Sequence, residues 1–371
     1  MNKFKNRCWI EIDLNNLDYN LNQFKNIISN KTEIMAVLKA DAYGHGAVQI
    51  AKRLIENDIT HFAVSSLEEG ILLRENGIQG EILVFGYTYP EYLYLISEYD
   101  LTQTIVDYKY ARLINLLNLN IKGHLKINTG MNRNGINYND VSEVIDVFHM
   151  PNITITGIYS HLSSCNTNNV DDIEHTKKQI DKFDQVLNTL KEMNIDYGLS
   201  HIQSTYGITN YSELDYDMVR LGNGLYGMKT DINDYMKIEL DLKPLLSFKC
   251  RVNSIRNILH EEPIGYGRSY MAPTEMKIAA LSVGFADGFP RSLSNIGMVE
   301  VNNRQHAIIG RICMDQLLID ITGNNIKQGD VVTLIGEMTP VEELANMANT
   351  ITSDFLVGIS KRVPVFYINN I

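Results

Sequence analysis

Residues 33–46 have the sequence EIMAVLKADAYGHG, which joins a short apolar run to a turn rich in polar residues. The apolar run, Ile34–Leu38, is too short to cross a membrane and is typical of a buried strand. Lys39 follows directly at the end of this strand. Burial lowers the pKa of a lysine and makes its amine usable as a nucleophile or a base. A lysine at a strand end can equally extend its charge into solvent, and this stretch alone leaves both interpretations open.

Apolar runs of strand length alternate with amphipathic, helix-like segments over about the first 230 residues. The predicted strands are Ile34–Leu38, His61–Ser65, Glu81–Phe85, Thr102–Val106, His124–Ile127, Gly157–His161, Leu199–Gln203 and Met218–Leu221. The predicted helices between them include Ala47–Glu56, Ser66–Glu75, Pro90–Glu98 and Ile173–Met193. This alternation favours an α/β fold with an N-terminal (β/α)8 TIM-type barrel. An open doubly wound sheet is the alternative, but no G-x-G-x-x-G follows an early strand.

After about residue 237 the pattern changes to strand-like segments separated by Gly, Asn and Asp turns. Thr339–Ala348 is the one clear helix there, with Thr339 as N-cap and Pro340 at the first helical position. We therefore predict a barrel domain over residues 1–236 and a C-terminal, mainly β domain over residues 237–371. The sequence leaves open whether Cys8–Asp13 pairs with the β domain.

The composition excludes several classes of protein. The chain of 371 residues is 44% hydrophobic and 21% charged, as expected for a globular protein with a sizeable core. A net charge of −11, without any basic cluster, argues against nucleic acid as a partner. The four cysteines are far apart and match no metal or redox motif, so we expect free thiols in a reducing compartment and no metal. No signal peptide and no membrane-spanning stretch is predicted, and we expect a cytoplasmic protein.

The barrel prediction places chemistry-bearing residues at one end. Active sites of such barrels lie at the carboxyl ends of the strands, and phosphates are often held by the loops after strands seven and eight. Those loops are Ser204–Gly207 and Leu221–Gly224, whose hydroxyls and free amides can bind a phosphate or simply form turns. Lys39, His161 and Arg220 end other strands at the same edge. A reactive lysine beside a phosphate site is what pyridoxal phosphate requires, although an aldolase-type lysine for sugar phosphates fits these residues almost as well.

A series of sequence blocks matches a known family. The blocks are AVLKADAYGHGA (36–47), KINTGMNRNG (126–135), GIYSHL (157–162), VRLGNGLYG (219–227), IGYGRSY (264–270), VGFADGFPRSLS (283–294) and GRICMDQ (310–316). In this order, over nearly the whole chain, they resemble the alanine racemases, the fold-type III pyridoxal phosphate enzymes. The resemblance implies a barrel followed by a β domain, and a homodimer in which the barrel of one subunit faces the β domain of the other.

The resemblance also implies two catalytic bases. Lys39 is expected to form the Schiff base with pyridoxal 5'-phosphate and to act as one base, and Tyr266 of the partner subunit to act on the opposite face. Racemisation needs such a pair, because one group removes the Cα proton and the other returns a proton from the other side. Since a phenol is ordinarily protonated at neutral pH, we expect a cation near Tyr266. Arg220 is expected to face the pyridine nitrogen, which it cannot protonate.

Further cofactor contacts are implied at matched positions. The phosphate ligands are expected to be Tyr43, Thr205, Gly222 and Asn223. His161 and His201 are expected beside the ring, with His201 steadying Arg220.

The implied substrate contacts come from both domains. Arg133 is expected to meet the cofactor phenolate oxygen or the substrate carboxylate, and Lys126 lies where many relatives carry a carbamylated lysine that orients this arginine. In the β domain, Met314 is expected to offer its backbone amide to the substrate carboxylate, with Asp315 beside it.

Three positions depart from the family pattern. Ser353 stands where members usually have a tyrosine that reaches the phosphate and narrows the pocket, and the loss of a phenol ring opens space for a polar substrate group. Asn166 and Asn128 stand where aspartates are common. Similar changes at the pocket tyrosine occur in the vancomycin-resistance serine racemases, which also carry a membrane domain.

We therefore expect a racemase that interconverts L- and D-serine and alanine and supplies D-amino acids for peptidoglycan precursors. The sequence is compatible with a cytoplasmic enzyme or with the cytoplasmic domain of a membrane protein. One alternative is an alanine racemase without serine preference, in which Tyr270 or Tyr206 fills the space left at Ser353. The other is a non-catalytic pyridoxal phosphate carrier, although such proteins are usually shorter and lack the β domain with Tyr266.

Overall fold

Eight parallel strands close into a barrel in the computed structural model, which describes residues 4–369. The strands are β2 (Glu33–Val37), β3 (His61–Val64), β4 (Glu81–Val84), β5 (Thr102–Ile105), β6 (Ile121–Asn128), β8 (Ile153–Tyr159), β9 (Leu199–His201) and β10 (Met218–Leu221). Successive strands pair in this order, and β10 pairs with β2 to complete the ring. All eight predicted strands and the barrel are confirmed.

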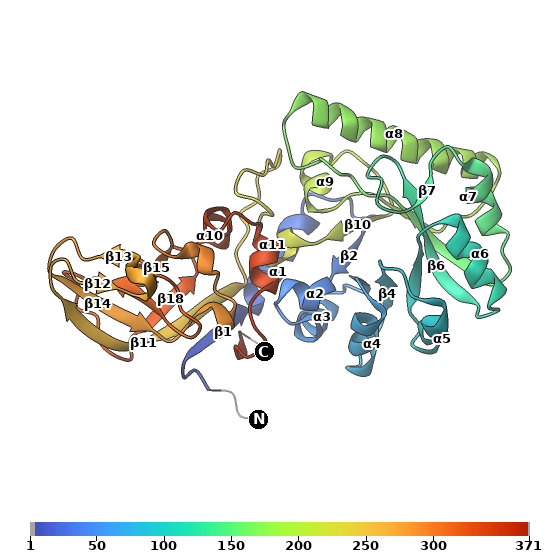
Figure 1. Ribbon diagram of the computed structural model, residues 1–371. Coiled ribbons are helices and arrows are strands. Elements are labelled where there is room, and N and C mark those ends of the chain that lie inside the picture. The colour runs from blue at the N-terminus through green and yellow to red at the C-terminus, as the bar shows by residue number, and fades with distance from the viewer. Residues whose placement is uncertain (1–3, 370–371) are drawn as a thin grey trace. The chain divides into compact units, whose positions relative to one another are not determined.

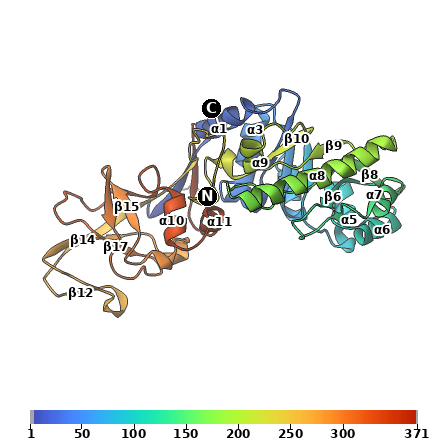
Figure 2. The ribbon, with the colours of Figure 1, turned by 90° about the horizontal axis from the view of Figure 1, so that it is seen from above.

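Helices surround the barrel strands, and Figure 1 shows α4 and α6 outside the ring. The helices of this part are α1 (Leu14–Lys25), α2 (Lys39–Tyr43), α3 (Ala47–Ile55), α4 (Leu67–Glu75), α5 (Leu93–Glu98), α6 (Tyr108–Leu116), α7 (Val141–Phe148), α8 (Val170–Glu192) and α9 (Thr205–Asn210). Short β7 (Ile136–Asn137) pairs parallel with the end of β6, and a 3-10 turn, η2 (Asn223–Tyr226), follows β10. The long α8 lies along one side of the barrel (Figure 2), where its apolar stripe is buried.

Alternation along the strands decides which side chains enter the barrel. Met35, Val37, Ala63, Leu83 and Met218 form one buried cluster in its interior. Residues two positions along the same strands share this face, which therefore includes polar side chains as well.

A second unit is mainly β. Its strands are β1 (Cys8–Asp13), β11 (Leu246–Ile258), β14 (Met276–Leu281), β15 (Met298–Val301), β16 (Arg304–Ala307), β17 (Leu317–Asp320), β18 (Val331–Ile335) and β19 (Val365–Ile368), with a separate hairpin of β12 (Pro263–Ile264) and β13 (Tyr270–Met271). The long β11 pairs with β1, β14 and β18. Cys8–Asp13 thus belongs to the β sheet, because it pairs antiparallel with β11 and parallel with β19.

By internal contacts the chain divides into two compact units. One comprises Leu21–Leu225 and Asp234–Asp241, and it is called the barrel unit below. The other comprises the described residues before Leu21, Tyr226–Asn233 and the residues from Leu242 onward, and it is called the β unit. None of the helices within residues 4–369 is long and apolar enough to cross a membrane.

The helices of the β unit differ in detail from expectation. The predicted helix over 339–348 is α10 (Val341–Met347), and Pro340 takes the N-cap position that we assigned to Thr339. Proline has no N–H to leave unpaired there, and its extended backbone precedes the first turn. A second short helix, α11 (Thr352–Val357), carries Ser353 and was not predicted, because six residues give little periodicity.

Candidate active site

Lys39 stands at the end of β2 and begins an unusual turn. Ala40, Asp41, Ala42 and Tyr43 all have φ of 53–54°. A left-handed conformation costs an L-residue about 1–2 kcal/mol, so four in succession must be held by their surroundings. The turn carries the chain sharply away from Lys39, whose side chain is half-buried at the mouth of the barrel.

Two carboxylates hold this turn in place. Glu69, on α4, accepts hydrogen bonds from the Ala40 amide at 2.7 Å and the Ser65 amide at 2.7 Å. Asp41 accepts from the Ala47 amide at 2.7 Å. The sequence did not single out Glu69. Its spacing three residues after the N-cap Ser66 is that of a capping box, but its carboxylate reaches out to the lysine turn instead of back to Ser66.

The electrostatic surroundings of Lys39 suit a reactive amine. Burial lowers the pKa of Lys39, the guanidinium of Arg133 lowers it further, and Glu69 opposes this shift. Lys39 Nζ lies 5.7 Å from the centre of the Tyr43 ring. Proximity of a second cation and partial burial both favour the neutral, nucleophilic form.

The loops after β9 and β10 meet around one hydroxyl. The Gly222 and Gly224 amides both donate to Thr205 Oγ1 at 3.4 Å. The Thr205 hydroxyl hydrogen can therefore turn toward an anion. A Cβ atom on Gly222 would lie 2.9 Å from the Tyr43 hydroxyl, so only glycine leaves room for that phenol. Asn223 follows at the start of η2.

Arg220 is buried, and both terminal nitrogens of its guanidinium group donate hydrogen bonds. Nη1 donates to His201 Nδ1 at 2.7 Å, and Nη2 donates to His161 Nδ1 at 3.0 Å. Nη2 also donates to the carbonyls of Ser160 and Ile202. The Nε–H makes no hydrogen bond to any residue in the described range 4–369 and remains a donor for a ring nitrogen.

Protonation in this cluster follows from burial. Burial lowers the pKa of His201 and His161 well below the usual range, and Arg220 adds to the effect, so both rings are neutral. Burial lowers the pKa of Arg220 to about 10, which leaves it charged at neutral pH. Because an arginine has no acceptor, both rings must accept at Nδ1 and carry their hydrogen on Nε2.

A second buried basic side chain, Lys126, lies near Arg220. Lys126 Nζ is 4.1 Å from the centre of the Tyr159 ring, and the Arg220 guanidinium carbon is 5.3 Å from the same centre. Burial lowers the pKa of Lys126 well below its usual range, with Arg220 and Arg133 acting in the same direction. The barrel mouth thus gathers four basic side chains, and Glu69 is the carboxylate whose charge acts on Lys39.

The two asparagines at usually acidic positions both have structural partners. Asn128 Oδ1 accepts from the Gly130 and Asn132 amides, which shapes the loop before Arg133. Asn166 Nδ2 donates to Asp234 Oδ1 at 2.5 Å, and Asp234 also accepts from the Tyr206 hydroxyl.

The remaining predicted residues lie in the β unit. Tyr266 begins the turn between β12 and β13, is 68% exposed, and makes no hydrogen bond through its hydroxyl to residues 4–369. The guanidinium of Arg311 lies beside this turn, since a Cβ on Gly267 would be 2.9 Å from Arg311 Nη1. Ser353 is half-buried on α11.

The loop that carries Met314 is fixed by a cluster of charges. Buried Asp287 binds Arg7 through both carboxylate oxygens and Arg362 at 2.8 Å, and Arg362 also bonds Asp315 at 2.7 Å. The Cys313 and Met314 carbonyls accept from the amides of the segment just before Asp287. Burial alone raises the pKa of Asp287, but the two arginines outweigh it and lower the pKa. Arg7 and Arg362 lie 280 and 75 residues from Asp287, so no local sequence pattern indicates this cluster.

The barrel unit therefore brings nine of the predicted residues to one end. These are Lys39, Tyr43, Lys126, Arg133, His161, His201, Thr205, Arg220 and Gly222. Their chemistry fits pyridoxal phosphate: the Gly222 and Gly224 amides converge on the Thr205 hydroxyl, a free Nε–H remains on Arg220, and Lys39 has a lowered pKa. Tyr266, Met314 and Ser353 belong to the other unit.

Two family models match the chain. Residues 12–230 match the alanine racemase N-terminal domain, and residues 245–367 match the alanine racemase C-terminal domain. A curated alanine racemase of Halothermothrix orenii is 40% identical over 382 aligned residues, with both chains fully covered. A serine/alanine racemase of Enterococcus gallinarum is 39% identical over 93% of this chain and 49% of its own length. This chain spans about half the length of that protein and of two Enterococcus faecalis amino-acid racemases.

Solved structures of alanine racemases are similar to this chain over nearly its whole length. Alanine racemase from Clostridium difficile matches with a TM-score of 0.92 and 33% identity, covering 99% of this chain and 98% of its own. Alanine racemase from Bartonella henselae with covalently bound pyridoxal phosphate matches with a TM-score of 0.86 and 27% identity, covering 98% of this chain and 99% of its own.

Proposed function

The chain belongs to the alanine racemase family, whose members depend on pyridoxal phosphate, and we propose that it racemises serine as well as alanine by a two-base mechanism. The observation that carries the proposal is the pair of a half-buried Lys39 of lowered pKa and a barrel mouth lined with basic side chains. Such a mouth suits a ligand with a phosphate and a carboxylate.

The residues act in separate roles. When bound, pyridoxal phosphate withdraws electrons from the Cα of the attached amino acid. Lys39 holds the cofactor and exchanges the Cα proton on one face, and Tyr266 of the partner subunit exchanges it on the other. Tyr43, Thr205, Gly222 and Asn223 hold the phosphate. Because both bases are needed for each turnover, we propose that the working enzyme is a homodimer.

Further groups position the reactants. Arg220 stays protonated and offers its Nε–H to the ring nitrogen, while His161 keeps its hydrogen on Nε2. Arg133, which bonds no residue within 4–369, is available for the substrate carboxylate, and the Met314 amide joins it. A carbamylated Lys126 would give Arg133 an anionic partner that the described residues lack.

Serine specificity rests on the opened position at Ser353. A hydroxyl there in place of a phenol gives both space and a hydrogen-bond partner for the serine side chain. The relative named serine/alanine racemase supports this assignment, and the fully covered alanine racemase relative supports alanine alone.

Kinetics on both substrates test the assignment. We expect comparable kcat/KM for L-Ser and L-Ala in the parent chain, and a fall of about tenfold or more for L-Ser alone in Ser353→Tyr. Val357→Tyr adds the same ring at a residue of α11 that is 44% exposed, and should change neither value. A strong alanine preference in both the parent and Ser353→Tyr would reject the serine assignment and leave an alanine racemase.

A further inference from the structure

A row of polar side chains runs through the interior of the barrel unit, from Arg220 in the candidate active site to Glu81 at the start of β4. Arg220 Nη1 donates to His201 Nδ1, and His201 Nε2 lies 2.9 Å from His124 Nδ1. His124 Nε2 lies 2.9 Å from Glu81 Oε1. This contact is not aligned as a hydrogen bond, yet neither atom has another hydrogen-bond partner among residues 4–369. Barrel interiors are usually filled with branched apolar side chains, so this row needs an explanation.

The direction of every hydrogen in the row follows from its first member. Arginine only donates, so His201 accepts at Nδ1 and carries its hydrogen on Nε2. His201 then donates to His124, which must accept at Nδ1 and carry its own hydrogen on Nε2. That hydrogen faces Glu81. A protonated His124 would leave two donors facing each other, so the geometry requires a neutral ring.

The row ends on a carboxylate. Burial alone raises the pKa of Glu81, but the neighbouring side chains of His124, His61 and Lys122 together outweigh it, so the pKa falls and the group is ionised. Arg220 is 3% exposed, and its own hydrogen-bond partners are carbonyls and neutral rings. A buried charge without a counter-charge is costly, and the row links Arg220 to one.

The sequence makes room for the row. An ideal Cβ on Gly157 would lie 2.6 Å from the His124 ring, so the side chain of His124 occupies space that only glycine on β8 leaves open. His201 also stacks on Tyr159, with ring centres 4.8 Å apart and planes 3° from parallel. Neither ring can turn freely to exchange its donor and acceptor atoms.

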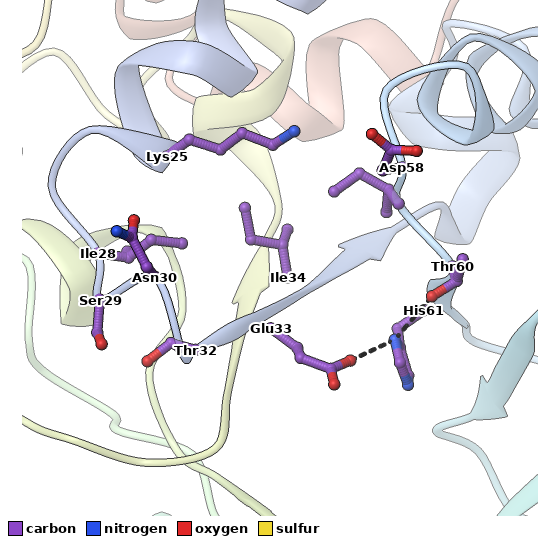
Figure 3. A pocket seen from close by; sticks show the side chains of 11 residues that line it. Lys25, Ile28, Ser29, Asn30, Thr32, Glu33, Ile34, Asp58, Thr60 and His61 are labelled. Carbon is purple, nitrogen blue, oxygen red and sulfur yellow. Dashed lines mark hydrogen bonds and ion pairs between the residues drawn. The ribbon is translucent and has the colours of Figure 1, made fainter.

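Beyond Glu81, the row continues through His61 to Glu33 at the protein surface. His61 Nε2 lies 4.0 Å from Glu81 Oε2, and His61 Nδ1 lies 3.0 Å from Glu33 Oε2. Figure 3 shows His61 and Glu33 facing each other in a polar pocket at the amino ends of the strands, where Thr60 and Asp58 also lie. The side chain of Glu33 is 49% exposed, so solvent screens its charge, whereas Glu81 is 22% exposed.

We propose that Glu81 is the counter-charge of Arg220, acting through His124 and His201, and that these three are positioning residues which fix the donor that Arg220 presents to the ring end of the site. The row itself is independent of the reaction, but its effect on racemisation rests on the proposed function. Because His201, His124 and Glu81 hold the Arg220 guanidinium on the side away from the cofactor, its charge and orientation do not depend on a bound cofactor.

The test is Glu81→Gln in the holoenzyme, with Glu33→Gln as the matched control. Glu81→Gln removes the partly buried charge and nearly keeps the shape of the side chain, and Glu33→Gln removes the more exposed charge at the far end of the row. Nitrogen-15 spectra of histidine-labelled protein report which ring nitrogen carries hydrogen, and His124→Asn, which keeps an acceptor for His201, assigns the signals.

We expect His201 and His124 of the parent to be neutral with hydrogen on Nε2. In Glu81→Gln we expect the His124 signals to move, the absorbance of the bound cofactor to shift, and kcat to fall about tenfold with KM nearly kept, as for outer partners of ligating histidines. Glu33→Gln should match the parent. If Glu81→Gln does not fold, the same shift in cofactor absorbance and the same fall in kcat are expected in His124→Asn.

Two results would overturn the proposal. One is hydrogen on Nδ1 of either ring in the parent, and the other is a Glu81→Gln or His124→Asn enzyme whose cofactor absorbance and kcat equal those of Glu33→Gln. Failure of the parent to racemise any amino acid would instead reject the proposed function, because the ring spectra do not depend on turnover.

Discussion

The carboxyl end of the barrel and the Tyr266 turn of the β unit carry the two proposed bases in opposite environments. Lys39 is half-buried and directly precedes a strained turn that two carboxylates hold. Tyr266 is 68% exposed, on a two-stranded hairpin, with Arg311 beside its turn. Burial and neighbouring groups of the barrel unit thus lower the pKa of Lys39, whereas Tyr266 is exposed in the β unit. The following predictions test this contrast.

The largest effect is expected at the buried base. Lys39→Ala removes both the covalent attachment of the cofactor and one proton-transfer group, and should lower kcat by more than about 10⁴-fold. Racemisation followed by polarimetry, together with the absorbance of bound cofactor, measures this. Lys52→Ala, at an exposed lysine of α3, should behave as the parent. Substantial racemisation by Lys39→Ala would show that another group is the base.

Tyr266, the exposed base, should contribute less than Lys39 to cofactor binding and nearly as much as Lys39 to catalysis. Tyr266→Phe removes one hydroxyl, and we expect kcat to fall about 10²–10⁴-fold while the absorbance of bound cofactor is unchanged. Loss of cofactor together with activity would contradict the division of roles between the two units. Unchanged racemisation would argue against a second base at this turn.

The charge cluster beneath the Met314 loop should dominate stability of the β unit. Asp287→Asn leaves Arg7 and Arg362 without their buried partner, and should lower the free energy of unfolding by about 3–5 kcal/mol. Denaturant unfolding followed by circular dichroism measures this. Asp315→Asn, at a side chain that is 55% exposed, should cost only about 0–1 kcal/mol. An equal loss of unfolding free energy in the two variants would show that the buried ion pairs of Asp287 do not stabilise the β unit more than the exposed pair of Asp315.

The same cluster has a definite pH dependence. The folded-state pKa of Asp287 is lowered, so the stabilisation it provides is fully present above its unfolded-state pKa. It is lost as the pH falls through the lowered, folded-state value. The difference in unfolding free energy between the parent and Asp287→Asn should therefore be constant near neutral pH and shrink on acidification below about pH 4. A difference that grew on acidification would contradict this assignment.

The smallest effect is expected at the phosphate loops. Gly222→Ala places a Cβ 2.9 Å from the Tyr43 hydroxyl and forces that phenol to move, at a cost of about 1–3 kcal/mol. We expect cofactor affinity to fall about tenfold, measured by titration of the apoenzyme, with kcat at saturating cofactor nearly kept. If the cofactor affinity of Gly222→Ala equals that of the parent, Tyr43 and Gly222 do not bind the phosphate.

The barrel and the placement of its reactive residues could be predicted from local sequence patterns alone. Eight strand-length runs implied parallel strands, and because the carboxyl ends of such strands share one edge, Lys39, His161 and Arg220 had to lie together. The motifs then indicated pyridoxal phosphate. These features are local, since each depends on a strand and the turn that follows it.

Other features depend on contacts between segments that are distant in the sequence. The left-handed turn after Lys39 depends on Glu69 of α4, and β1 pairs with β11, which follows the whole barrel in the sequence. The row from Arg220 to Glu81 joins strands that are distant in the chain, and its contacts depend on the register with which the barrel closes. A register shift of one residue would turn each of these side chains to the other face of its strand, and a linear sequence does not state that register.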